Sequence, residues 1–385
     1  MRRTRTFVIG AALTALAAAL GPAARSAGQT VSTGSQPAAR APSFEVDPFW
    51  PRPLPNHWLF GSITGVAVDA QNHVWVVHRG AASMTARTEI GLATNPPTAE
   101  ACCAPAPFVL RFDPAGRLVS HWGGPGAGYD WPQSPGGITV DAAGHVWIAA
   151  SGPADPMPGA RGRGAGSGQP PAPPDAHILK FSAAGKFLLQ IGKPGQTGDN
   201  DSTTALHRPM AVDVDTAANE VYVADGLGNQ RIVVFDARTG AYKRHWGANG
   251  ATPFNAPACV KLSTDGLVYV CDRRNNRIQV FRKDGTFVKE ATVAKATRGE
   301  GSVWSVAFSN DARQRFLYVA DGSNQKVWVL DRQTLAPVSS VGAGGRWPGH
   351  FYGVGSVAVD SGGNLYTGET YEGKRLQKFQ IKGAR

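Results

Sequence analysis

One pattern of short strands recurs six times between residues 61 and 381, and this repetition constrains the fold more than any other feature. Each copy reads as a short apolar strand, a tight turn, a second strand with an aromatic residue, and then a third and a fourth strand. The second strands align without gaps and read VWVVHR (74–79), VWIAAS (146–151), VYVADG (221–226), VYVCDR (268–273), LYVADG (317–322) and LYTGET (365–370). Such a unit cannot bury both faces of its sheet alone, so neighbouring copies must stack against one another.

The turns between the first and second strands support the same interpretation. They contain segments such as DAAGH and STDGL, in which Gly, Asn and Asp tolerate the positive φ that a tight hairpin requires. The composition agrees, because 47 glycines, 28 prolines and only 17% charged residues suit many short strands joined by turns. We therefore predict an all-β fold, a six-bladed β-propeller with a central channel.

The sixth copy is incomplete, because the sequence ends soon after its third strand at residues 375–381. An open sheet edge would invite pairing with another chain. The segment SFEVD (43–47) has the short alternating pattern of a strand, and we expect it to supply the missing outer strand near Phe44 to Asp47. The ring would thus be closed by an N-terminal strand.

The first 26 residues have the pattern of a secretory signal peptide. A basic start precedes an apolar run from Phe7 to Leu20 and a stretch of small residues, and the run is too short for a stable membrane span. An uncleaved N-terminal anchor is the alternative. We predict a signal peptide (1–26), a flexible leader (27–43) and one propeller domain (44–385), with no membrane span after cleavage, in a secreted or periplasmic protein.

The formal net charge falls from +11 to +7 when the four arginines of the signal are removed. A charge of that size favours solubility and attraction to anions, and it says nothing about the fold. Export makes nucleic acid an unexpected partner. We expect a monomer, and a protein partner stays open. Two long insertions, 80–106 and 152–175, interrupt the repeats on one rim.

Two of the repeats carry an aspartate followed by Asn-x-Arg-Ile, in CDRRNNRIQVF and ADGLGNQRIVVF, and this motif resembles the NHL repeat. The span from Gly61 to Phe379 further resembles the propeller of the peptidyl-α-hydroxyglycine α-amidating lyases and their bacterial relatives. That resemblance rests on TGVAVD, VVHRG, PGGITVD, DGLGNQRI, CDRRNNRIQ and VGSVAVD in the same order. It implies a six-bladed propeller, but one propeller frame hosts many functions.

The resemblance also implies a catalytic zinc held by three histidines of the innermost strands. The six corresponding positions here are Thr64, Gly136, Met210, Ala258, Trp304 and Gly355. The three that should be histidine are Gly136, Ala258 and Gly355, and none of these can bind a metal through its side chain. The position of the family's catalytic tyrosine holds Leu227. We therefore predict no metal and no cofactor.

The arginine pair of that family is retained as Arg79 and Arg273, which close the second strands of the first and fourth copies. Two guanidinium groups facing one cavity would suit a carboxylate or another flat anion. The alternative is that each pairs with a neighbouring acid such as Asp272 or Glu369. His78 precedes Arg79 and is a third candidate for the ligand site, with a satisfied core histidine as the alternative.

An acid recurs at one position of the repeat, as Asp225, Asp272, Asp321 and Glu369. Its repetition favours a structural role, in which the acid accepts hydrogen bonds from the following loop or pairs with Arg231, Arg277 or Lys326. A ring of metal-binding carboxylates is the alternative.

Several aromatic residues are candidates to line the channel or its rim, with packing between blades as the alternative. They are Trp131, Trp304, Trp347 and Tyr352.

The chain has four cysteines, an even number, which suits an oxidising compartment. Cys259 and Cys271 flank the hairpin turn STDG and fall almost opposite each other, so we predict a disulfide between them. The adjacent Cys102 and Cys103 leave two alternatives open, a strained ring closed by a disulfide or a pair of free thiols.

These observations favour an exported binding or scaffold protein that holds a small anionic or peptide ligand at the channel mouth, near Arg79, Arg273 and His78. The alternative is an enzyme resembling the amidating lyases with a lost or relocated metal site. A third hypothesis is association with an anionic polymer through a basic rim that includes Arg161 and Arg163.

Overall fold

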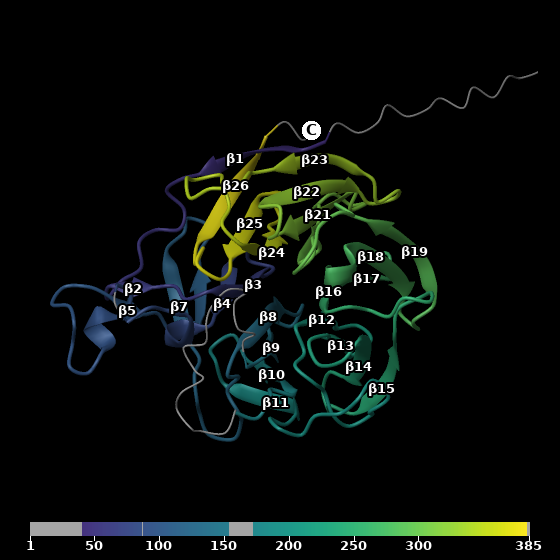
Figure 1. Cartoon of the computed structure of the whole chain (residues 1–385), viewed down its shortest axis with the longest axis horizontal. Helices are drawn as coiled ribbons and strands as arrows, with labels where there is room; N and C mark the ends of the chain where they lie inside the picture. The colour runs from purple at the N-terminus through teal and green to yellow at the C-terminus, as the bar shows by residue number, and fades with distance from the viewer. Residues whose placement is uncertain (1–40, 87, 154–171, 383–385) are drawn as a thin grey trace, which may run out of the picture. The chain divides into compact units, whose positions relative to one another are not determined.

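The computed structural model describes residues 41–86, 88–153 and 172–382. In these ranges the chain forms six four-stranded antiparallel sheets and one short parallel pair, β2 (Trp58–Leu59) with β5 (Ala104–Pro105) (Figure 1). The predicted all-β, six-bladed propeller is confirmed. The predicted signal peptide, nearly all of the leader, and Arg161 and Arg163 lie outside the described residues.

The strands of each blade follow one another from the channel outward in chain order. Blade 1 contains β3 (Ile63–Val68), β4 (Val74–His78), β6 (Val109–Phe112) and β7 (Leu118–Trp122). Blade 2 contains β8 (Pro135–Val140), β9 (Val146–Ala150), β10 (His177–Phe181) and β11 (Phe187–Gly192). Blade 3 contains β12 (Ala211–Asp215), β13 (Glu220–Asp225), β14 (Arg231–Asp236) and β15 (Tyr242–Trp246).

The remaining three blades repeat this order. Blade 4 contains β16 (Pro257–Leu262), β17 (Leu267–Asp272), β18 (Arg277–Arg282) and β19 (Phe287–Thr292). Blade 5 contains β20 (Ser305–Phe308), β21 (Phe316–Asp321), β22 (Lys326–Asp331) and β23 (Pro337–Val341). Blade 6 contains β24 (Val354–Val359), β25 (Leu365–Glu369) and β26 (Leu376–Lys382). The described part of the chain also contains three short 3₁₀ helices, η1 (Gly80–Ser83), η2 (Gly91–Ala93) and η3 (Arg273–Asn275).

The outer strand of blade 6 comes from the other end of the described chain. β1 (Ser43–Asp47) pairs with β26 in antiparallel register, from Ser43 opposite Lys382 to Asp47 opposite Lys378 (Figure 1). The Phe44 ring also meets the Tyr318 ring of blade 5 edge to face. The predicted ring closure by residues 43–47 is therefore confirmed.

The core is divided among the interfaces between blades. Six clusters of buried apolar side chains each combine residues of two neighbouring blades, and the last joins blade 6 to blade 1. Trp75, Trp147, Tyr222, Tyr269, Tyr318 and Tyr366, one from each second strand, are nearly inaccessible to solvent. The aromatic position of the repeat is thus the main packing residue between blades. In the described ranges, no helix has the length and apolarity needed to cross a membrane.

The repeated turn residue and the aromatic are also linked by hydrogen bonds. In blade 1, Asp69 accepts the backbone N–H groups of Gln71 and His73, and Trp75 Nε1 donates to Asp69 Oδ2 at 2.9 Å. Asp141 and Trp147 make the same contact in blade 2 at 3.0 Å. The carboxylate therefore stabilises the hairpin and orients the buried ring, which explains why both residue types recur.

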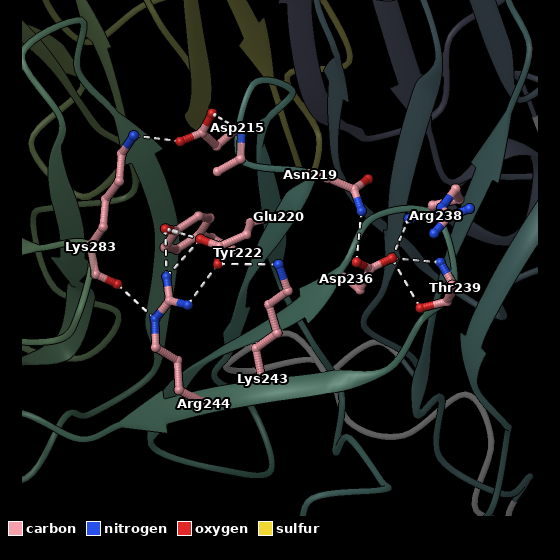
Figure 2. A network of polar contacts seen from close by, with 11 residues as sticks. Asp215, Asn219, Glu220, Tyr222, Asp236, Arg238, Thr239, Lys243, Arg244 and Lys283 are labelled. Carbon is pink, nitrogen blue, oxygen red and sulfur yellow. Dashed lines mark hydrogen bonds and ion pairs between the residues drawn. The ribbon is translucent and has the colours of Figure 1, made fainter.

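Blade 3 has a charged network at the turn end of the blade, in which Glu220 takes the place of the turn aspartate as the partner of the buried aromatic (Figure 2). Glu220 accepts hydrogen bonds from Tyr222 Oη at 2.7 Å and from both terminal nitrogens of Arg244, at 2.8 and 2.7 Å. Arg244 Nε donates to the carbonyl oxygen of Lys283, and the Lys283 ammonium pairs with Asp215. The network ties the outer strand β15 to β13 and to blade 4.

Candidate ligand site at the channel mouth

The first strands of all six blades line one central cavity of about 400 Å³. The side chains or backbones around it include every position at which the resemblance places a channel residue: Thr64, Gly136, Met210, Ala258, Trp304 and Gly355. Arg79, Ser151, Arg273, Thr370 and Tyr371 line the same cavity from the ends of the second strands. The six positions that the resemblance implies therefore lie on the wall of the channel.

The channel positions are set apart from the regular sheet by β-bulges. The pairing of first and second strands shifts register at Thr64 in blade 1, at Gly136 and Gly137 in blade 2, at Ala258 in blade 4 and at Gly355 in blade 6. A bulge leaves a residue out of the ladder and redirects its side chain. A side chain at one of these bulges would therefore be placed at the channel. Three of the four bulges, however, contain only Gly or Ala.

The zinc site implied by the resemblance does not fit this channel. Zinc needs nitrogen, sulfur or carboxylate donors, and Gly136, Ala258 and Gly355 provide none. A Cβ atom at Gly136 would lie 2.7 Å from the carbonyl oxygen of Met210, so no side chain fits there unless the backbone moves. Within the described ranges, no group of three or more His, Cys, Asp and Glu side chains is placed to hold a metal ion.

Arg273 is held flat against the channel wall by blade 5. Its guanidinium carbon lies 3.7 Å from the centroid of the Trp304 ring, and its Nη2 lies 2.5 Å from Glu300 Oε2. Arg274 Nη2 contacts the other oxygen of Glu300 at 3.2 Å. Two arginines therefore share one carboxylate, and the group keeps a net positive charge beside the channel.

Arg79 lies in blade 1, across the ring from Arg273 in blade 4, and it lines the same cavity. Its backbone N–H donates to Ser62 O at 3.0 Å, which fixes the point where its side chain leaves the sheet. Tyr371 of blade 6 completes this end of the channel, and its ring meets Trp304 edge to face at 6.0 Å. The mouth therefore combines two guanidinium groups with two aromatic rings.

His78 lies behind the mouth and does not line the cavity. Its side chain is fully buried, and Nδ1 accepts the backbone N–H groups of Gly61 at 3.1 Å and Gly80 at 3.0 Å. Nε2 contacts the carbonyl oxygen of Pro107 at 2.8 Å. Burial lowers the pKa of His78 to about 4, so the ring is neutral at physiological pH. It holds the backbone of Gly80, which follows Arg79, and that of Gly61, which precedes β3.

The recurring acids have the predicted structural role. Asp225 pairs with Arg231 at 2.9 Å, Asp272 with Arg277 at 2.6 Å and Glu369 with Arg375 at 2.8 Å. Asp321 departs from this pattern, because it accepts hydrogen bonds from Asn324 and Trp328 while the Lys326 ammonium lies over the Trp328 ring. Burial is the largest effect on these four carboxyl groups and raises the pKa of each.

Both cysteine pairs are bonded in the structure. Cys259 and Cys271 face each other directly across β16 and β17 and form a disulfide, as predicted. Cys102 and Cys103 also form a disulfide, which decides between the two alternatives that the sequence left open. No cysteine of the chain is free.

Two residues of the mouth carried no usable signal in the sequence. Glu300 lies in the connection after β19, outside the repeated strands, and nothing in the pattern pairs it with Arg273. Tyr371 follows β25 in a turn and has a positive φ of 50°. A scan of all loops that join the strands, within blades as well as between them, for acids and aromatics would have made both residues candidates.

Comparison with known proteins agrees with this geometry. The NHL repeat family model matches residues 254–281, which include the first and second strands of blade 4 and all but the last residue of the third. The chain is a six-bladed β-propeller that carries an NHL repeat in blade 4. Human NHL repeat-containing protein 3 is 29% identical to this chain over 175 residues, which cover 43% of this chain and 46% of that protein. The chain thus spans less than half the length of this relative.

A lyase is also among the relatives of this chain. The probable peptidyl-α-hydroxyglycine α-amidating lyase pgal-1 of Caenorhabditis elegans is 24% identical over 298 residues, covering 71% of this chain and 72% of that protein. Among solved structures, a streptogramin B lyase superimposes with a TM-score of 0.51 at 13% identity, covering 88% of this chain and 98% of that one. The structural likeness shows a shared fold, and the sequence likeness confirms the resemblance to the amidating lyases.

Proposed function

We propose that this NHL propeller is an exported binding or scaffold protein that holds a small anionic or peptide ligand at the mouth of its channel. The observation that carries the proposal is the presence of Arg79 and Arg273, from opposite blades, on the wall of one cavity of about 400 Å³. A cavity of this size suits a small molecule or the end of a peptide.

The chemistry of the mouth supports an anionic group on the ligand. A guanidinium presents its donors in a plane that matches the two oxygens of a carboxylate. Stacking on Trp304 holds the plane of Arg273 in one orientation, and sharing Glu300 with Arg274 leaves net positive charge at this side. In this proposal His78 positions the Arg79 backbone and does not touch the ligand.

The two disulfides support export, because disulfides persist in oxidising compartments. The apolar segment at residues 7–20 supports it as well, as a signal peptide. We therefore propose that the protein is located in the periplasm or outside the cell.

The test is a calorimetric and thermal-shift screen of mono- and dicarboxylates and short peptides. We expect binding by a carboxylate-bearing ligand, weakened roughly tenfold or more in Arg79→Gln, because a charge-assisted contact contributes about 1.5–3 kcal/mol. Arg117→Gln is the matched control, because this exposed arginine pairs with Asp113 away from the channel. Equal affinity in Arg79→Gln and the wild type would contradict the proposal.

An enzyme resembling the amidating lyases, with a lost or relocated metal site, is the second candidate. The relatedness to the lyase of C. elegans favours this candidate. The channel opposes it, because the residues at the zinc-ligand positions have no metal-binding side chains. We expect substoichiometric zinc in the purified protein and no turnover of a peptide ending in α-hydroxyglycine. Turnover that a chelator abolishes would establish the enzyme and displace the binding proposal.

A further inference from the structure

The connection between blades 5 and 6, residues 342–353, forms a loop whose backbone is fixed from the interior; we refer to it as the blade 6 loop. The buried Glu369 accepts a hydrogen bond from Arg375 Nε at 2.8 Å. The same guanidinium donates to the carbonyl oxygens of Arg346 at 2.5 Å and His350 at 2.7 Å. A buried ion pair thus uses its remaining donors to hold the blade 6 loop in one conformation.

Further contacts fix the two arms of the loop. Gly349 N donates to Gln377 Oε1 at 2.9 Å, and Tyr352 N donates to Glu369 Oε2 at 3.1 Å. Phe351 N donates to Ala343 O at 2.8 Å, and the Phe351 side chain is fully buried in the core. The loop is therefore rigid although its tip lies at the surface.

The same device holds the corresponding loops of two other blades. Arg231 donates to the carbonyl oxygens of Asn200, Ser202 and Ala205 before blade 3, and Arg277 donates to Thr252 O before blade 4. No large apolar side chain is exposed in those two connections, residues 193–210 and 247–256, all of which the structure describes. In the blade 6 loop, Trp347 is 77% exposed and Tyr352 is 41% exposed. Exposed aromatics are thus a property of this loop and not of the repeat.

The charge of the loop is one-sided. Residues 342–353 contain no acid. The exposed Arg346 guanidinium lies 4.2 Å from the centroid of the Tyr352 ring, and it makes no ion pair with any residue in the described ranges. A free cation held on an aromatic face next to an exposed indole would attract an anionic ligand that has a flat apolar surface.

We infer that the blade 6 loop is a binding site for an acidic carbohydrate, in which the Trp347 ring stacks on the apolar face of a sugar and Arg346 binds the carboxylate of a uronic acid. A protein interface of ordinary size buries about 800 Å² per partner around an apolar centre. The blade 6 loop offers one indole and one cation among glycines and a proline, which suits a single sugar ring. The site uses neither Arg79 nor Arg273 and is separate from the proposed channel ligand.

The test measures binding of the full chain to a short oligogalacturonate by calorimetry and by quenching of tryptophan fluorescence. A neutral cello-oligosaccharide and polyacrylate of similar length are the comparison ligands. We expect the oligogalacturonate to bind more tightly than either, because it alone offers both the sugar face and the carboxylate. Trp347→Ala should weaken its binding roughly tenfold or more, the loss of about 1.4 kcal/mol of contact.

Arg346→Gln should weaken binding of the oligogalacturonate and leave any weak binding of the neutral sugar unchanged. Phe49→Ala is the control for the aromatic, because Phe49 is also 77% exposed but follows β1. Arg238→Gln is the control for the charge, because Arg238 is exposed on the turn after β14. An unchanged melting temperature in all variants shows that the fold is intact.

Two results would overturn the inference. The first is oligogalacturonate binding that is absent, or equal in Trp347→Ala and the wild type. The second is polyacrylate binding as tight as that of the uronate, because charge alone would then explain the interaction. Loss of the channel ligand in Arg79→Gln has no bearing on this outcome, so the two sites are tested separately.

Discussion

A histidine stands in blade 1 at the repeat position that is acidic in four other blades. Asp225, Asp272 and Glu369 each accept a backbone N–H from the residue three positions before the channel residue of their blade. His78 does the same for Gly61 through Nδ1, and a neutral imidazole can accept this bond only at its unprotonated nitrogen. The substitution therefore keeps the hydrogen bond and removes the charge.

The buried His78 makes stability depend on pH. Its pKa is about 4 in the folded protein against 6.5 in the unfolded chain, so the unfolded state binds more protons between these values. Stability should fall as the pH is lowered from 6.5 toward 4, by up to about 3 kcal/mol at 1.4 kcal/mol per pKa unit. Urea unfolding at a series of pH values measures this loss.

A His78→Ala variant isolates the effect, because it should be less stable at pH 8 but should lose less on acidification. His177, whose pKa is also lowered by burial, contributes in both proteins and cancels in the comparison. The exposed His57→Asn is the control and should follow the wild type. Parallel pH profiles of His78→Ala and the wild type would show that the imidazole is not the source.

At the scale of elements, ion pairs with a buried carboxylate hold the loops and strands of several blades in place. The ion pairs that follow the second strands hold the preceding connections, and Glu220 with Arg244 holds the outer strand of blade 3 (Figure 2). The hydrogen bonds from Arg244 lower the pKa of Glu220 from 4.5 to about 2, despite its partial burial. In blade 3, Tyr242 and Trp246 of β15 also pack against the cores between blades, and the Glu220–Arg244 pair adds a polar link between β15 and β13.

Replacement of Arg244 should weaken blade 3 in a pH-dependent way. The pKa of Glu220 is depressed in the fold, so its contribution is present above pH 4.5 and is lost as the pH falls toward 2. Arg244→Leu should cost about 2 kcal/mol near neutral pH, since it leaves Glu220 with only the Tyr222 hydroxyl and the Lys243 ammonium as partners. The difference from the wild type should shrink in acid.

Chemical unfolding of Arg244→Leu and the wild type at pH 7 and pH 3 measures both effects. The control is Arg238→Leu, on the turn between β14 and β15 in the same blade, which should change stability little. A difference between Arg244→Leu and the wild type that stays constant from pH 7 to pH 3 would exclude the carboxylate as the partner that matters.

At the scale of the whole molecule, the ring depends on a strand that lies more than 300 residues from its partner in the sequence. Pairing with β1 gives blade 6 its fourth strand and covers the edge of β26 that would otherwise be unpaired. Closure of this kind joins the two ends of the propeller, and it makes opening between blade 6 and its neighbours costly.

Deletion of β1 should therefore open the ring edge. A chain that begins at residue 49 should melt at a lower temperature than one that begins at residue 41, and it should self-associate through the exposed β26 edge. Calorimetry and light scattering compare the two truncations, which differ only in residues 41–48. Identical melting and a monomeric state in both would show that β1 does not contribute to closure.

The sequence alone predicted most of the fold and part of the site. The strand pairs, the closing segment 43–47 and the disulfide between Cys259 and Cys271 followed from local sequence patterns. The channel positions and the pair Arg79 and Arg273 came from the resemblance to the amidating lyases, and all of them line the central cavity. The pairing of Asp321 with Lys326 was not found, because Trp328 takes the hydrogen bond instead.

What the sequence by itself determined is the order of strands and turns, because alternation and turn chemistry act between residues close along the chain. Only the tertiary structure decided that Glu300 neutralises part of Arg273, that the His78 ring turns away from the channel, and that Trp347 lies exposed on a rigid loop. These outcomes depend on which distant segments meet when six blades close into a ring, and no local pattern records that meeting.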